Sequence, residues 1–153
     1  PQMRAIFAAL LLFNLGDFTF AGENAVAVYL LDHTDKKKTE TRFWDDWNNS
    51  WRGVVELKKV TGKEADTLVA LMKKSLLPEE ATNFCGHDPI YGIIVKTEDG
   101  KTLKTSLCFK CLTWVRPKER LSISGKPGAE NQLCIELRKI IELPPELLKK
   151  PKE

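Results

Sequence analysis

The segment 85–111 constrains the fold of this chain more than any other. It contains three of the four cysteines, and two β-rich runs, 91–97 and 102–109, lie on either side of Asp99-Gly100. Asp-Gly between two such runs predicts a β-hairpin. With the turn at this dipeptide, residues whose numbers sum to about 199 face one another. We therefore expect an antiparallel sheet built around this hairpin.

Other parts of the chain carry the patterns of further strands. Short runs rich in β-formers predict strands at 25–31, 54–60, 112–115 and 120–124. These runs are bounded by polar or turn-forming residues, as expected for strands of a small sheet.

Two segments have apolar residues at helical spacing. The first follows Thr61, where Thr61 and Glu64 fit a capping box, and Pro78 is expected to end it. The second covers 131–143. Their apolar stripes are Ala65, Leu68, Val69, Met72 and Leu76 in the first, and Leu133, Cys134, Leu137, Ile140 and Ile141 in the second. The expected fold class is α+β, an antiparallel sheet of about four to six strands with two main helices on one face.

The N-terminal segment has the layout of a secretory signal peptide. Arg4 precedes nine apolar residues (5–13), and a more polar region with Thr19 and Ala21 follows. The apolar run is shorter than the roughly twenty residues that span a bilayer, so no stable membrane span is expected after cleavage.

This layout predicts the domain organisation. We expect a signal peptide over 1–22, a single α+β domain over 23–146 and a flexible lysine-rich tail over 147–153. The protein would be secreted or periplasmic, where cysteines are oxidised to disulfides.

Composition and motifs exclude several function classes. The formal net charge is +3, and acidic residues are interleaved with the lysines, which is typical of a solvated surface and not of a nucleic-acid interface. The sequence has no Gly-rich phosphate loop, no G-x-S-x-G and no H-E-x-x-H. We therefore expect no nucleic-acid partner and no enzyme of these classes.

The four cysteines predict disulfides in an exported chain. The hairpin register places Cys111 opposite the neighbourhood of His87-Asp88, so Cys85 comes within reach of it. Cys85 to Cys111 is the first expected pairing, and Cys108 to Cys134 is the possible second. Cys134 lies on an apolar helix face, so a buried free thiol is the other interpretation of this residue.

Two alternatives use the same cysteines. Cys85, His87, Cys108 and Cys111 form a Cys3His set whose spacing suits tetrahedral zinc. Cys108-Phe-Lys-Cys111 also has the C-x-x-C spacing of thiol–disulfide oxidoreductases, although no helix is expected to begin there to lower a thiol pKa.

Three of the four tryptophans are close together, at Trp44, Trp47 and Trp51. Their spacing of three and four places them on one face if the segment is helical. Exposed tryptophans among Asp and Asn can form a platform for a sugar, whereas buried ones would pack on the sheet. They are the candidate ligand-binding residues.

The cysteine segment also resembles a known pattern. Cys85, Gly86 and Pro89 precede a hairpin that leads into Leu107, Cys108, Phe109 and Cys111. This order resembles that of small exported or membrane-associated bacterial domains of unknown function. The resemblance covers about thirty residues and implies no particular activity.

These observations predict an exported α+β domain without enzymatic activity, stabilised by one or two disulfides. It would bind a protein partner or a small ligand and need no cofactor. The alternatives are a zinc-binding domain and a thiol–disulfide oxidoreductase.

Overall fold

A computed structural model of the chain describes residues 25–34, 39–45, 49–82, 85–96, 102–116 and 119–148. The predicted signal peptide (1–22), the Asp99-Gly100 turn and the end of the tail (149–153) lie outside these ranges. The division into a signal peptide, one domain and a tail stays a prediction.

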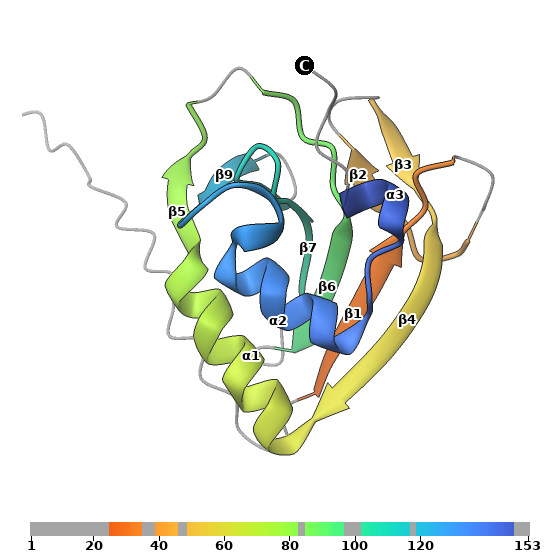
Figure 1. Cartoon of the computed structure of the whole chain (residues 1–153), viewed down its shortest axis with the longest axis vertical. Helices are drawn as coiled ribbons and strands as arrows, with labels where there is room; N and C mark the ends of the chain where they lie inside the picture. Colours follow the sequence, from red (N-terminus) through yellow and green to blue (C-terminus); the bar gives the residue numbers. More distant parts are fainter. Residues whose placement is uncertain are drawn as a thin grey trace, which may run out of the picture.

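The fold class is α+β, as expected (Figure 1). The elements in chain order are β1 (Ala25–Leu31), β2 (Phe43–Asp45), β3 (Ser50–Arg52), β4 (Val54–Thr61), α1 (Gly62–Ser75), β5 (Leu76–Glu80), β6 (Tyr91–Lys96), β7 (Thr102–Cys108), β8 (Thr113–Arg116), β9 (Glu119–Ile123), a 3-10 turn η1 (Gly128–Glu130), α2 (Gln132–Ile140) and α3 (Pro145–Leu148).

The main sheet is antiparallel and has seven strands in the order β4-β1-β6-β7-β8-β9-β5. Six of these strands are those expected from the sequence. The seventh, β5, was not expected, because its Pro78 reads as a helix stop. In fact α1 ends at Ser75, and Pro78 lies in a strand at the sheet edge, where a missing N–H is tolerated.

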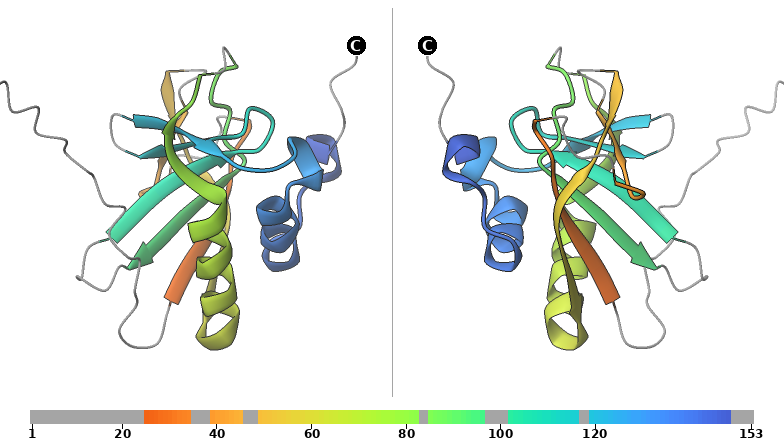
Figure 2. Two further views of the ribbon diagram at one scale, coloured as in Figure 1. Left: turned by 90° about the vertical axis from the view of Figure 1, so that its left-hand side faces the viewer. Right: turned by 90° about the vertical axis from the view of Figure 1, so that its right-hand side faces the viewer.

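Both main helices pack on the same face of the sheet, as expected (Figure 2). Buried residues of α1 (Ala65, Leu68, Val69, Met72) and α2 (Leu133, Cys134, Leu137, Ile140) share one apolar core with strand residues such as Val28, Tyr91, Ile93, Leu107 and Trp114. A smaller apolar cluster of Tyr29, Leu31 and Phe43 lies apart from this core. Because side chains alternate along strands, Tyr29 and Leu31 project from the face opposite that of Val28 and Leu30.

The two helices begin differently from one another. At α1 the expected capping box does not form: the Thr61 side chain makes no capping hydrogen bond, and Gly62 begins the helix at φ 59°. This left-handed backbone conformation suits glycine and changes the geometry that the box requires. At α2 the Asn131 side chain accepts a hydrogen bond from the Leu133 N–H, so this helix has a true cap.

The β6–β7 register differs by one residue from the expectation. Tyr91 pairs with Leu107 and Lys96 with Thr102, so paired numbers sum to 198 and not to about 199. Five residues, 97–101, connect the last pair, Lys96 and Thr102, so the paired numbers have an even sum. A two-residue turn at Asp99-Gly100 would have given an odd sum. A one-residue shift moves a side chain to the other face of a sheet. Leu107 therefore shares the core face with Tyr91, and Cys108 faces the other way.

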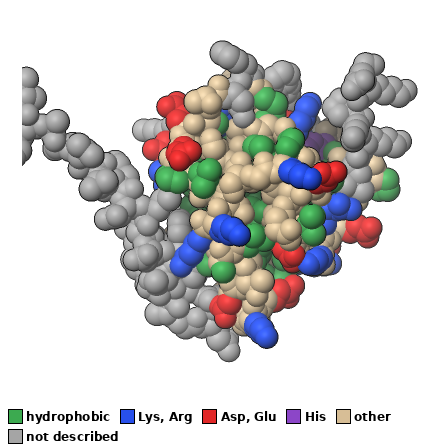
Figure 3. Space-filling model, turned by 60° about the vertical axis from the view of Figure 1, so that its left-hand side comes forward, with side chains coloured by type: hydrophobic (Ala, Val, Ile, Leu, Met, Phe, Trp, Pro, Cys, Tyr) green, Lys and Arg blue, Asp and Glu red, His purple; other side chains and the backbone are tan. Residues whose placement is uncertain are grey.

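The surface carries charges of both signs. Figure 3 shows basic and acidic side chains scattered over one face of the molecule. In the described part of the chain, no helix is long and apolar enough to cross a membrane.

Tyr91 links the sheet to the end of α2, and this link gives a first prediction. Its hydroxyl donates a buried hydrogen bond of 2.6 Å to the Ile141 carbonyl. Tyr91→Phe should lower the free energy of unfolding by about 1–3 kcal/mol, because the buried carbonyl loses its donor. Urea denaturation measures the change. Tyr29→Phe is the matched control and should cost less than about 0.5 kcal/mol; equal effects of the two substitutions would contradict this role of Tyr91.

Candidate functional site

The expected disulfide between Cys85 and Cys111 is present, with a Cα–Cα distance of 5.6 Å. It joins the segment that leads into β6 to the turn between β7 and β8. The hairpin brings these two segments together, since the Ile90 N–H donates to the Leu107 carbonyl just before β6 begins. The cysteine-rich segment is thus held closed by a covalent cross-link.

The possible second disulfide, Cys108 to Cys134, is not present in the structure, and both cysteines are free and buried. The sheet separates them: Cys134 belongs to the core under the helices, whereas Cys108 faces the other side with its cross-strand neighbour Thr113. Burial raises the pKa of both thiols, that of Cys134 to about 11. Of the two interpretations of Cys134, a disulfide or a buried free thiol, the structure shows the buried free thiol.

The described residues do not assemble the alternative zinc site. Cys85 and Cys111 are bonded to each other, and both ring nitrogens of His87 contact hydroxyl groups. No group of metal-ligating side chains is found in the described ranges.

The oxidoreductase interpretation has little support from the C-x-x-C segment. The thiol of Cys108 is buried and its pKa is raised, mainly by desolvation, which opposes formation of a reactive thiolate. A turn follows β7, so no helix dipole acts on this thiol.

His87 lies at the centre of a buried polar cluster. Its side chain is fully buried, with Nδ1 2.8 Å from Thr113 Oγ1 and Nε2 2.8 Å from Ser106 Oγ. The Ser106 hydroxyl donates to the Trp44 carbonyl at 3.1 Å. Because that hydroxyl has only one proton, Nε2 is the donor in the contact between His87 and Ser106. The cluster thus ties the disulfide segment to β7, β8 and the strand β2.

Arg52 lies at the centre of a second network, which fixes the hairpin β2–β3. Its guanidinium is almost fully buried and bonds three chain segments. Nε lies 2.6 Å from Asp45 Oδ2, Nη1 donates to the Asp32 carbonyl at 3.1 Å, and Nη2 lies 3.0 Å from Asp88 Oδ1. Asp45 is fully buried, so the ion pair within the hairpin is shielded from water.

His33 belongs to the edge of this network. Its Nδ1 lies 3.7 Å from Asp88 Oδ1, and its side chain is 19% exposed. Burial lowers the pKa of His33, and the nearby Arg52 charge lowers it further. The histidine is therefore held toward its neutral form beside the ion pairs.

The described parts of the tryptophan segment are the two strands of a hairpin, so the helical arrangement that the spacing allowed does not apply to Trp44 and Trp51. Phe43 pairs with Arg52, Trp44 with Trp51 and Asp45 with Ser50. The two indoles are cross-strand neighbours with centroids 5.3 Å apart and an interplanar angle of 70°. Trp47 lies outside the described residues. Asn49, just before β3, has φ 48°, a left-handed conformation that a regular helix does not contain.

Phe43 anchors this hairpin on the main sheet. It is buried against Tyr29, with ring centroids 5.2 Å apart. A Cβ atom added at Gly92 would lie 2.5 Å from the Phe43 ring. The glycine in β6 therefore leaves the space that the ring fills.

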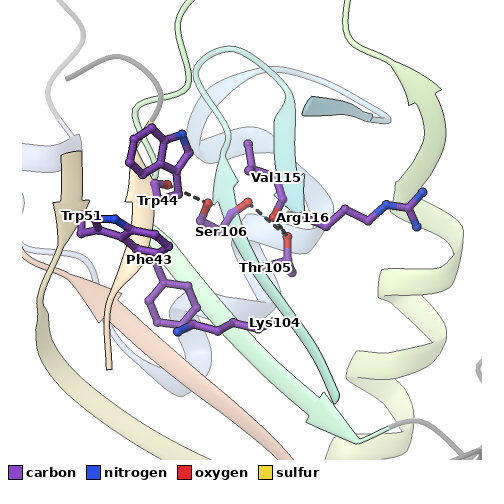
Figure 4. Close-up of a pocket in the computed structure, with 8 residues that line it drawn as sticks. All are labelled: Phe43, Trp44, Trp51, Lys104, Thr105, Ser106, Val115 and Arg116. Atoms are coloured by element: carbon purple, nitrogen blue, oxygen red, sulfur yellow. Dashed lines mark hydrogen bonds between the residues drawn. The ribbon is translucent and has the colours of Figure 1, made fainter. Parts of the chain in front are cut away.

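Between this hairpin and strands β7 and β8 lies a cavity of about 450 Å³ (Figure 4). We call it the hairpin pocket; it is lined by Phe43, Trp44, Trp51, Lys104, Thr105, Ser106, Val115 and Arg116. The three aromatic rings come from the hairpin, whereas the other residues come from the sheet. Trp51 is 57% exposed, the largest exposure among the bulky apolar side chains that the structure describes.

The two cations of the pocket differ in their availability. The guanidinium of Arg116 points away from the three aromatic rings of the pocket (Figure 4). It forms an ion pair with Glu119 and lies 5.7 Å from the Trp114 ring. Lys104 Nζ lies 5.1 Å from the centroid of the Phe43 ring. In the described ranges no carboxylate pairs with Lys104. Lys104 is therefore the cation that a ligand can reach.

Of these pocket residues, sequence reasoning identified Trp44 and Trp51 and missed Phe43, Lys104 and Ser106. Comparison with known proteins adds no further assignment, since no family model, no curated protein and no solved structure matches the chain. The functional argument therefore depends on the geometry of the site.

The disulfide gives a second prediction. Cys85→Ser/Cys111→Ser should lower the free energy of unfolding by roughly 3.5 kcal/mol, because the bond closes a loop with a sequence separation of 26 residues. Denaturant titration of the two proteins measures the loss. As a control on the bond itself, the denatured but unreduced protein should show two reactive thiols, those of Cys108 and Cys134; four would contradict the pairing.

The Arg52 network gives a third prediction. Arg52→Met should lower the free energy of unfolding by about 3–5 kcal/mol, since it leaves the buried Asp45 carboxylate without its counter-ion. The matched control is Arg116→Met, which removes a partly exposed ion pair and should cost less than about 1 kcal/mol. Equal losses in the two variants, measured by urea denaturation, would refute the role of Arg52.

Proposed function

We propose that this protein is a binding module without enzymatic activity, whose hairpin pocket holds a small molecule with a flat apolar body and one acidic group. The observation that carries the proposal is the arrangement of Trp44, Trp51 and Phe43 as one wall of the cavity, with Lys104 beside it. The pocket's volume of about 450 Å³ suits a small organic ligand.

The apolar part of the ligand follows from the aromatic wall. Trp44 and Trp51 meet nearly edge to face, so one indole presents its face and the other its edge. Trp51 is more than half exposed. Covering so large an aromatic side chain with a ligand would be favourable. A planar or aliphatic group placed in the cavity would remove this apolar area from water.

The acidic group follows from the charges. Lys104 is exposed, and its ammonium lies over the Phe43 ring, beside the cavity. Asp45, in the same hairpin, is already paired with Arg52. A carboxylate or sulfonate in the pocket would therefore meet a cation and no competing anion from these residues.

The remaining lining groups favour an apolar acid over the glycan for which Trp44, Trp47 and Trp51 were candidates. Glycan recognition needs several hydrogen-bonding groups beside the aromatic platform. The Ser106 hydroxyl is engaged by His87 and the Trp44 carbonyl, and the Thr105 hydroxyl donates to the Val115 carbonyl at 2.7 Å. The polar side chains of the sheet are thus committed within the protein.

The cysteine chemistry supports a structural role beside this site. The disulfide closes the hairpin, and the free thiols are buried with raised pKa values. Such thiols are poor nucleophiles. Together with the predicted signal peptide, this favours an exported binding domain over an oxidoreductase.

The test uses two matched probes, naphthalene-2-carboxylate and its neutral carboxamide, titrated by isothermal calorimetry. The carboxylate should bind on the order of tenfold more tightly than the amide, because it alone pairs with Lys104. Trp51→Ala should weaken both probes, since both lose the aromatic wall. Lys104→Met should weaken the acid to the level of the amide and leave the amide unchanged.

The control is Lys126→Met, which removes an exposed lysine from the segment before η1 and should change neither affinity. A preference for the acid that persists in Lys104→Met would refute the role of the lysine. Failure of both probes to bind the wild-type protein would refute the proposed ligand class.

A further inference from the structure

Strand β4 forms one edge of the seven-stranded sheet and pairs only with β1. Figure 1 shows it along the outer side of the sheet. It has eight residues, Val54–Thr61. An edge strand presents unpaired backbone N–H and C=O groups, which can pair with a strand of another chain.

The two edges of the sheet differ in how they are protected. The opposite edge, β5, is shorter and contains Pro78, which has no N–H to donate to a further strand. In β4, by contrast, residues 55–59 are all exposed, including Val55 at 44% and Leu57 at 45%. Two of the three bulky apolar side chains exposed in the described ranges therefore lie on one unpaired edge.

The charges of β4 are complementary to themselves about Leu57. If two copies pair antiparallel with Leu57 opposite Leu57, Glu56 of each copy faces Lys58 of the other. Within one strand these residues already lie on the same face, with Lys58 Nζ 3.5 Å from Glu56 Oε1. The pairing thus places opposite charges on both sides of the central leucine pair.

Neighbouring registers lack this complementarity. If the two strands pair with Glu56 opposite Glu56, two carboxylates face each other. If they pair with Lys58 opposite Lys58, two ammonium groups face each other. Like charges directly opposite one another destabilise a strand pair. The charges therefore favour the register centred on Leu57.

We propose that the protein forms a two-fold symmetric homodimer through antiparallel pairing of β4 with β4 of a second copy, centred on Leu57. The interface is isologous, as in most homodimers, because the same strand contributes to both sides. Leu57 lies cross-strand from Tyr29, so the two leucines join the outer faces of the two sheets into one apolar strip. The hairpin pocket takes no part in this contact, so the dimer and the proposed ligand are independent of each other.

The test is sedimentation velocity of the wild-type protein and charge variants, at concentrations up to about 0.5 mM, since an interface of one strand pair is small. The wild-type protein should form a dimer. Glu56→Lys and Lys58→Glu should each dimerise about tenfold more weakly, because each places like charges opposite one another. The two residues are about half exposed, so both single variants should fold, which circular dichroism checks.

Two further samples separate the proposed pairing from a general effect of charge. An equimolar mixture of Glu56→Lys with Lys58→Glu should form a heterodimer, since each chain then offers the charge that the other needs. The double variant Glu56→Lys/Lys58→Glu should regain the wild-type dimer. A monomeric wild-type protein, single variants as dimeric as the wild type, or failure of the mixture and the double variant to recover would each overturn the proposal.

Discussion

The placement of Arg52 is the interaction on which the functional half of this structure depends. One guanidinium bonds the end of β1 through the Asp32 carbonyl, the hairpin through Asp45, and the disulfide segment through Asp88. A guanidinium has donors on three separate nitrogens and can reach acceptors in three chain segments, whereas a lysine offers all its donors from a single nitrogen. The hairpin β2–β3 has only three residues in each strand, and an isolated hairpin is marginally stable at best. Its position over the sheet therefore depends on Arg52 and on Phe43, which packs above Gly92.

The two faces of the main sheet serve different purposes. One face is covered by α1 and α2 and forms the apolar core. The other carries the polar cluster of His87, Ser106 and Thr113, and the hairpin pocket. Ser106 belongs to both, because its hydroxyl contacts the His87 ring and lines the cavity. The floor of the pocket is therefore part of the main sheet, whereas its aromatic wall comes from the hairpin β2–β3.

The sequence allowed much of the fold to be predicted, and less of the site. Period-two runs and helical stripes identified six of the seven strands and both main helices, because these patterns reflect burial on one face. The strand β5 and the hairpin β2–β3 were missed for local reasons: Pro78 resembles a helix stop, and the tryptophan spacing of three and four imitates a helix. A shift of one residue in the β6–β7 register determines which face of the sheet Cys108 is on. That register follows from the length of the connection 97–101 and not from the Asp-Gly signal.

The pocket could not be predicted because it joins residues far apart in the chain. Lys104 and Ser106 alternate along β7 with residues of the core face, and nothing in their local sequence shows that a hairpin 60 residues earlier covers them. Arg52 is similar, since its contact with Asp88 spans 36 residues. The Cys85–Cys111 pairing was accessible because a hairpin fixes geometry between neighbouring segments. Contacts between supersecondary units, by contrast, depend on the assembled fold.

The disulfide has a topological consequence. Cys85 and Cys111 enclose β6, β7 and the whole connection between them in a covalent ring. A protease that cuts the chain once between Lys96 and Thr102 would open this ring without releasing a fragment, since both new ends stay attached through the sulfur bridge. In an environment rich in proteases, a nicked molecule would remain a single species of unchanged composition, apart from one added water. The strands that form the floor of the pocket would still be held side by side.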